Sequence, residues 1–230
     1  MLDSPEAFSI LKAALLDFWE KESSPEQWEV GLLTILSKKG DLSLPGNYRG
    51  IVLLETLYKI AAIILHGRLQ PVIESIDHEE QCGFRPQRGC PDGIFTVKMA
   101  IKKRREHGLE TWIMFLDLVK AFDRVPREPL WKVLHKFGVP AKVVRLIEAL
   151  HEKVKVEFTV SGLTHTLDCT IGVKQGDILG PALFTLYIAA IMKTWRISNN
   201  RPLCVFRTKI DDILTGRRFT AHGEEFAVPD

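Results

Sequence analysis

Cysteine is scarce in this sequence: the 230 residues contain only Cys82, Cys90, Cys169 and Cys204, and no two of them form a C-x-x-C pair. This spacing suggests neither a zinc site nor a disulfide framework. We expect no signal peptide either, because Asp3 and Glu6 occupy the start of this sequence. We therefore expect an intracellular protein, in the nucleus or the cytoplasm.

A long apolar run is also missing. The longest, residues 178–192, has fifteen residues and is interrupted by Gly180 and Pro181. Because a membrane-spanning helix needs roughly 18 apolar residues, this run predicts a buried helix and no membrane partner.

The net charge of +2 indicates no partner by itself, but the charge is unevenly distributed. Residues 1–30 carry seven acidic and two basic side chains, a charge of −5, whereas residues 193–218 carry seven basic and two acidic ones, a charge of +5. Such polarity is compatible with a phosphate-bearing partner and equally with an ordinary solvated surface.

Apolar periodicity predicts an α+β fold. Ser4 is the expected N-cap of the first helix, which begins at Pro5, and Pro71 is expected to stop the second helix after Leu69. The predicted elements are helices at 5–22, 55–69, 94–107, 127–137, 140–151 and 178–192, strands at 30–36, 51–54 and 111–118, and a hairpin over 154–170 that turns at Ser161–Gly162.

Asp117 stands out because it follows four apolar residues, 113–116, in the predicted strand at 111–118. A buried carboxylate without a partner is strongly destabilising, so this position requires one. The candidates are a metal ion, the backbone of the turn that follows, Lys120 and Arg124.

Four segments resemble one protein family. Residues 115–123, F-L-D-L-V-K-A-F-D, resemble the first carboxylate motif, F-x-D-x-x-K-A-F-D, of the reverse transcriptases of non-LTR (LINE-like) retrotransposons and group II introns. Residues 172–184, G-V-K-Q-G-D-I-L-G-P-A-L-F, resemble that family's G-V-x-Q-G-D-P-L-S-P-x-L-F box. Residues 32–69 and 81–94 resemble its fingers region and the segment that follows. The segments stand in the family's order over roughly residues 28–195, and the non-LTR group is the more similar of the two.

The resemblance implies a right-hand polymerase. Residues 1–27 are then an N-terminal amphipathic helix, residues 28–110 a fingers-like region, and residues 111–230 a partial palm. The palm would be an antiparallel sheet packed on helices, without a thumb. The implied reaction is two-metal nucleotidyl transfer, with Mg²⁺ as cofactor and with an RNA template, a DNA primer and deoxynucleotides as partners.

The resemblance also implies site residues. Asp117 would be catalytic and bridge both Mg²⁺ ions, and the carbonyl oxygen of Leu118 would be a second metal ligand. The nucleotide-binding residues would be Arg49 and Lys38 (or Lys39) at the triphosphate, Phe122 under the sugar, and Gln175 with Gly176 at the nucleotide and template. Core packing is the alternative role for Phe122, and a solvated turn is the alternative for the lysines. Asp123 is expected to cap a turn.

The sequence departs from the family pattern in three places. Gly50 replaces the proline of Y-R-P-I, and Ile178 and Gly180 replace the proline and serine of the Q-G-D box. The second carboxylate motif, [FY]-A-D-D, is absent, and the only paired aspartates are Asp211 and Asp212. This pair is either a substitute or a surface turn.

Two functional hypotheses follow from these departures. The chain is a reverse transcriptase domain that has been shortened, or a non-catalytic nucleic-acid-binding remnant of one. In either case we expect it to bind nucleic acid weakly and not to extend a primer. We also expect Asp117 at the end of a central strand, facing one cleft with Phe122, Gln175 and Arg49.

Overall fold

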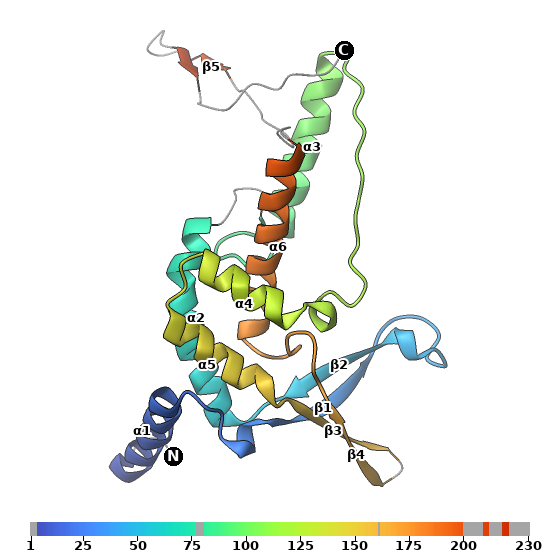
Figure 1. Ribbon diagram of the computed structural model, residues 1–230. Coiled ribbons are helices and arrows are strands. Elements are labelled where there is room, and N and C mark those ends of the chain that lie inside the picture. Colours follow the sequence, from blue (N-terminus) through green and yellow to red (C-terminus); the bar gives the residue numbers. More distant parts are fainter. Residues whose placement is uncertain (1–3, 77–80, 161, 200–208, 212–217, 221–230) are drawn as a thin grey trace. The chain divides into compact units, whose positions relative to one another are not determined.

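The computed structural model describes residues 4–76, 81–160, 162–199, 209–211 and 218–220 (Figure 1). The chain forms two compact units. The first unit comprises residues 1–78 and 116–188, and the second comprises residues 79–115 and 189–230. In the described part of the chain, no helix is both long enough and apolar enough to span a membrane.

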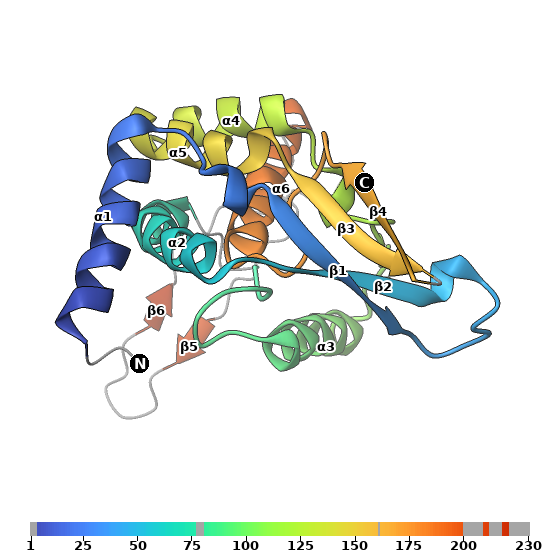
Figure 2. The ribbon, with the colours of Figure 1, turned by 90° about the horizontal axis from the view of Figure 1, so that it is seen from below.

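The first unit contains a four-stranded sheet in the order β2-β1-β3-β4 (Figure 2). Its strands are β1 (Val30–Ser37), β2 (Tyr48–Leu53), β3 (Lys155–Val160) and β4 (Leu163–Asp168). The β1–β2 and β3–β4 pairs are antiparallel, as the predicted hairpin over 154–170 requires. The β1–β3 pair is parallel, with Gly31 opposite Val156, so the sheet is mixed and the prediction of an antiparallel sheet was wrong.

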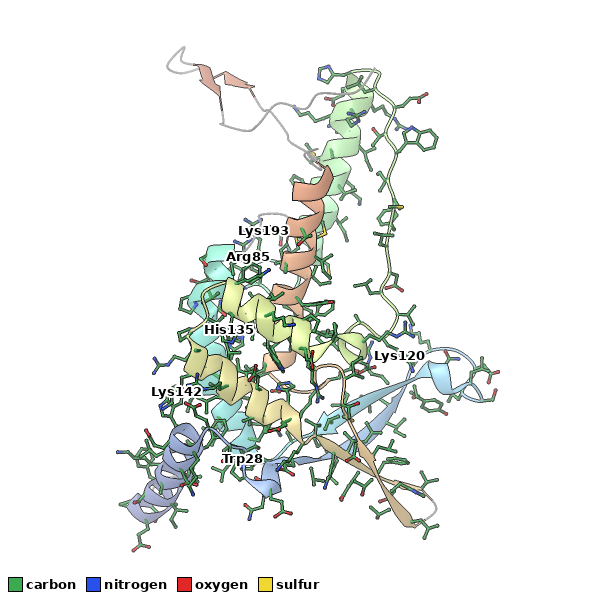
Figure 3. All side chains as sticks on the ribbon, in the orientation of Figure 1. Trp28, Arg85, Lys120, His135, Lys142 and Lys193 are labelled. Atoms are coloured by element: carbon green, nitrogen blue, oxygen red, sulfur yellow. The ribbon has the colours of Figure 1, made fainter. Side chains whose placement is uncertain are left out.

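Five helices belong wholly or partly to this unit: α1 (Pro5–Lys21), α2 (Thr56–Ile76), α4 (Arg127–Lys136), α5 (Ala141–Glu152) and the beginning of α6 (Leu179–Asn199). Three 3₁₀ turns also belong to this unit: η1 (Glu26–Trp28) between α1 and β1, η2 (Pro45–Asn47) between β1 and β2, and η3 (Phe122–Arg124) before α4. Figure 1 shows α2, α4 and α5 side by side next to the sheet. Apolar side chains of these helices and of Trp28, labelled in Figure 3, form one continuous core.

Helix α1 has the predicted bounds within one residue, with Ser4 at its N-cap and Pro5 at its first position. Trp19 of α1 lies beneath two cations, with the Arg68 guanidinium 5.9 Å and the Lys142 Nζ 5.2 Å from its ring centre. Lys142 is labelled on α5 in Figure 3. These cation–π contacts connect α1 to α2 and α5.

Helix α2 continues to Ile76, although Pro71 was predicted to stop it. Proline removes one helical hydrogen bond, which costs about 3 kcal/mol in a helix interior. The buried apolar face of α2 continues past Pro71, because Leu65, Leu69 and Ile73 lie at four-residue spacing and all three are buried. Burial of that face outweighs the proline penalty.

The second unit contains α3 (Cys90–Glu106), the end of α6, and a two-stranded antiparallel sheet of β5 (Lys209–Asp211) and β6 (Arg218–Thr220). Helix α3 begins four residues before the predicted start. The Asp92 carboxylate accepts a hydrogen bond of 2.7 Å from the Gly89 amide, and Pro91 occupies the first turn. These two residues favour the earlier start.

Residues 111–118 have no regular secondary structure, so the predicted strand there was wrong. The expected partners of this strand were the 154–170 hairpin region or the C-terminal segment, but β3 of that hairpin pairs with β1 on one side and with β4 on the other. Without a neighbouring strand, an apolar run has nothing to cover its two faces. Trp112, Met114, Phe115 and Leu116 are accordingly each at least 79% exposed.

The α+β fold class is confirmed, with six α-helices and two sheets in the described residues. The helices predicted at 127–137 and 140–151 and the strand at 30–36 agree with α4, α5 and β1 to within one residue at each end. The fold class alone does not divide the chain into fingers and palm, so the fingers region and the palm stay predictions.

Candidate functional site

The Gln175–Gly176 dipeptide forms the tip of a four-residue turn in the first unit. The Asp177 amide donates to the Lys174 carbonyl oxygen at 3.3 Å, which closes the turn. Gly176, at its third position, has φ +114°, which an L side chain adopts only with strain. The turn thus requires glycine where the sequence has it.

This turn lies against the outer edge of β2, the edge strand of the sheet. The Val52 amide donates to the Gln175 carbonyl oxygen at 2.9 Å. A Cβ atom at Gly176 would be 2.6 Å from the Val52 carbonyl oxygen and 3.2 Å from Ile51 Cγ2. The absence of a side chain at Gly176 therefore permits the close approach of the two backbones.

The residues just before this turn are joined to the 122–125 segment. The Gly172 amide donates to Val125 O and the Val173 amide to Phe122 O, both at 2.9 Å. Gly172 has φ +83°, and a Cβ atom there would be 2.6 Å from Asp123 O. The two motif segments found in the sequence are therefore in direct backbone contact, although Val173 and Phe122 are 51 positions apart along the chain (173 − 122).

Phe122 is half-buried and stacks on Phe184 of α6, with ring centres 4.9 Å apart and an interplanar angle of 28°. One face of its ring thus packs in the apolar core. The partial exposure leaves part of the ring accessible. Packing and nucleotide contact are both compatible with this position.

The two predicted triphosphate ligands lie on β2 and near the β1–β2 connection. Arg49 is exposed on β2, opposite Leu36 of β1, and shares a strand face with Ile51, which adjoins Gly176. Lys38 follows β1 directly and donates from its Nζ to Gly46 O at 3.3 Å. Lys38 thus has a local role in closing the β1–β2 connection, and its role at the triphosphate is a prediction.

Asp117 and Leu118 are exposed and lie on the irregular segment that precedes η3. Among the residues that the structure describes, no three His, Cys, Asp or Glu side chains gather closely enough to hold a metal ion. A two-Mg²⁺ site needs several convergent carboxylates, and Asp117 belongs to no such cluster of three in this set. Asp211 lies in β5 of the second unit, and Asp212 lies outside the described residues.

Both ends of the turn are buried charges, which sequence reasoning did not assign to the site. Lys174 is 6% and Asp177 is 5% exposed. The Tyr58 hydroxyl of α2 donates to Asp177 Oδ2 at 2.5 Å, and Asp177 Oδ1 accepts from the Leu179 amide at 3.1 Å. Lys174 Nζ donates to Leu150 O at 3.1 Å and lies 4.1 Å from the centre of the Tyr58 ring.

Burial dominates the ionisation of this group. It raises the pKa of Asp177, while the Tyr58 hydrogen bond opposes that rise. It lowers the pKa of Lys174 to about 8, and the negative charge of Asp177 opposes that fall. The pKa of Tyr58 is raised by burial and next by the charge of Asp177.

A second buried polar group adjoins this one. Arg127 of α4 donates to Gly172 O at 2.9 Å and to the carbonyl oxygen of His151. His151 is fully buried, and its Nδ1 lies 2.8 Å from Ile147 O. Its Nε2 has no hydrogen-bond partner within the described residues. Burial, then the charge of Lys174, lowers the pKa of His151 to about 3.

One sequence signal could have revealed the buried charges. Asp177 stands two residues before Leu179, where the apolar helix begins, which is a common N-cap arrangement. Its second partner, Tyr58, is 119 positions away, and no local pattern indicates such a contact.

Comparison with known proteins agrees with the motifs. Residues 36–222 match the reverse transcriptase (RNA-dependent DNA polymerase) family. The chain is 31% identical over 175 residues to the Transposon TX1 uncharacterized 149 kDa protein of Xenopus laevis, covering 76% of this chain and 13% of that protein.

Two further relatives show the same pattern of partial coverage. The Pol polyprotein of the type-1 retrotransposable element R2 of Popillia japonica is 28% identical over 170 residues, which is 73% of this chain and 24% of that protein. The group II intron-encoded protein LtrA of Lactococcus lactis is 28% identical over 131 residues, which is 57% of this chain and 19% of LtrA. This chain thus spans less than a quarter of the length of these three relatives. It belongs to the reverse transcriptase (RNA-dependent DNA polymerase) family, and its similarity to retrotransposon proteins confirms the predicted resemblance to the non-LTR group.

Proposed function

We propose that this chain supplies the nucleotide-contacting surface of an RNA-directed DNA polymerase. The observation that carries the proposal is the meeting of three motif segments in one unit. Gln175 is bonded to β2 through the Val52 amide, and Val173 is bonded to Phe122. Arg49, on β2, belongs to the same assembly.

Each residue has a distinct role in this proposal. Arg49 and Lys38 hold the triphosphate by charge-assisted hydrogen bonds. The exposed part of Phe122 lies under the sugar and excludes a 2′-hydroxyl, while Gln175 and Gly176 contact the nucleotide and the template. In this assignment residues 28–110 form the fingers-like region, residues 111–230 the partial palm, and residues 1–27 the helix that precedes them.

Asp117 and the Leu118 carbonyl are the proposed Mg²⁺ ligands. Mg²⁺ would stabilise the charge that develops on the attacking and leaving oxygens. The sequence lacks the [FY]-A-D-D motif that would supply the other carboxylates, and no cluster of three such ligands forms among the described residues. We therefore expect this chain alone to hold substrates without adding nucleotides.

The molecules that we propose this chain binds are a polynucleotide and the nucleotides from which it is built. Basic side chains stand on both units: Lys38, Lys39 and Arg49 on the first, and Arg85, Arg88 and Lys102–Arg105 on the second. Contacts of such groups with phosphates are independent of base sequence and weaken steeply with salt. An RNA template paired with a DNA primer is the proposed partner, inside the cell.

Two assays of the same chain test the proposal. Binding of an RNA–DNA hybrid should weaken by roughly tenfold to a hundredfold between about 50 and 200 mM salt, as a few phosphate contacts predict. Primer extension with Mg²⁺ and deoxynucleotides should give no product. Absence of salt-sensitive binding would contradict the proposal. Extension that is lost in Asp117→Ala and in Asp212→Ala would instead show that the second aspartate pair completes the catalytic site.

A further inference from the structure

We propose that Tyr58, Lys174 and Asp177 are positioning residues that fix the Gln175–Gly176 turn in its binding geometry. The inference rests on the proposed function only for what the turn contacts. The fixing of the turn rests on the hydrogen bonds of these three side chains.

The turn is fixed at both ends by side chains that are almost fully buried. Lys174 and Asp177 occupy its first and last positions, so their anchoring sets the direction in which the two residues between them point. Asp177 is anchored to α2 and to the start of α6. Lys174 is anchored to Leu150, in the last turn of α5. Three helices therefore determine where the tip lies.

Tyr58 connects the two anchors, because it contacts both of them. Its hydroxyl donates to Asp177, and its ring lies under the Lys174 ammonium group. Tyr58 itself is fully buried in the core. It is thus held firmly enough to transmit the position of α2 to the turn.

The arrangement differs from ordinary core packing in its composition. A buried lysine and a buried aspartate are costly, and apolar residues of similar size would fill the same space at lower cost. What the charged groups add is directionality, since their hydrogen bonds fix orientation as well as distance. Orientation matters for the tip, where the Gln175 side chain is half-buried and Gly176 is exposed.

The Val52 amide offers a local readout of the turn. It donates to Gln175 O, whereas Ile51 and Leu53, on either side, pair with Thr34 and Leu32 of β1. Because successive amides of a strand point to opposite edges, hydrogen exchange at Val52 reports on the turn and exchange at its neighbours reports on the sheet.

Tyr58→Phe removes only the hydroxyl and keeps the ring beneath Lys174. We expect the Val52 amide to exchange at least about tenfold faster in this variant, while Ile51 and Leu53 change by less than about threefold. Asp177→Asn should act in the same direction, because an amide offers one acceptor oxygen where the carboxylate satisfies two donors. Val144→Ala, in the α5 core, is the control for general destabilisation and should affect all three amides alike.

Nucleotide affinity is the second readout, measured with a fluorescent deoxynucleoside triphosphate and Mg²⁺. Tyr58→Phe should weaken binding at least about fivefold at a temperature where it and Val144→Ala are both folded, and Val144→Ala should bind as the unchanged chain does. Equal exchange at Val52 and its neighbours in Tyr58→Phe would overturn the positioning role. If the unchanged chain binds no nucleotide while Val52 responds as expected, the proposed function fails and the positioning role stands.

Discussion

Gly176 is the residue whose backbone the turn depends on most. Its φ of +114° and the 2.6 Å approach that a Cβ atom would make to Val52 O both oppose any side chain. We expect Gly176→Ala to lower the free energy of unfolding by about 1–3 kcal/mol, measured by urea denaturation. Gly67→Ala is a matched control, because Gly67 lies inside α2 with nothing within 4 Å of its Cβ position. It should raise stability by about 0.5–1 kcal/mol, and a Gly176→Ala variant that is equally stabilised would contradict the turn geometry.

His151 should make folding sensitive to mild acid. Its pKa of about 3 in the folded chain lies below the ordinary 6.5, so the unfolded chain binds a proton that the folded chain rejects. Its stabilising contribution is present above pH 6.5 and is lost as the pH falls towards 3. At about pH 5 the loss should be about 2 kcal/mol, because one pKa unit corresponds to about 1.4 kcal/mol.

The variant His151→Asn isolates this effect, since asparagine does not titrate and its amide nitrogen can replace Nδ1 as the donor to Ile147 O. Denaturation curves at pH 7 and pH 5 should converge more closely for this variant than for the unchanged chain. Parallel pH profiles of the two proteins would show that His151 does not cause the acid sensitivity.

Some residues of the site can be predicted from the sequence, and others cannot. Gln175, Gly176 and Phe122 are predictable because they stand at fixed positions in motifs, and the glycine also has a local conformational signal. Tyr58 and Lys174 are not predictable in this way, because their contacts with the turn depend on how α2 and α5 pack. The individual roles of Asp117, Leu118, Arg49, Lys38, Phe122, Gln175 and Gly176 remain predictions.

At the scale of elements, amphipathic segments are well predicted and segments that need a distant partner are not. Helices α4 and α5 show the apolar spacing that their shared core requires, so their bounds agree with the prediction. The run at 111–118 is as apolar as a buried strand, but it becomes a strand only if another strand pairs with it. Composition alone cannot supply that partner.

Helix α2 allows a direct test of how packing overrides a local signal. Pro71 is exposed on this helix, and its cost is offset by the buried face formed by Leu65, Leu69 and Ile73. Pro71→Ala should therefore raise the free energy of unfolding by about 1–3 kcal/mol, because it restores the missing amide donor without disturbing the core.

Pro5→Ala is the appropriate control for this change. Pro5 occupies the first position of α1, where its lack of an amide hydrogen costs nothing. Thermal or urea denaturation should show little effect of that substitution. A loss of stability in Pro71→Ala would mean that the proline is required by the packing of α2, contrary to this account.

At the scale of the whole molecule, the central claim is that the motif segments of the first unit form one nucleotide-contacting surface. Two backbone hydrogen bonds connect these segments, and the similarity to reverse transcriptases indicates what they would contact. The strongest test locates the nucleotide directly and does not depend on turnover.

Photo-crosslinking of an azido-deoxynucleoside triphosphate, with Mg²⁺ and an RNA–DNA hybrid present, provides that test. After proteolysis, mass spectrometry should find the label on peptides that contain residues 48–52, 120–124 or 172–177, and excess unlabelled deoxynucleotide should suppress it. Arg49→Ala should reduce the labelling, whereas Lys12→Ala, an exposed cation on α1 away from these segments, should leave it unchanged. Label confined to α1, α5 or the β3–β4 hairpin, or equal labelling of the Arg49→Ala variant, would contradict the account.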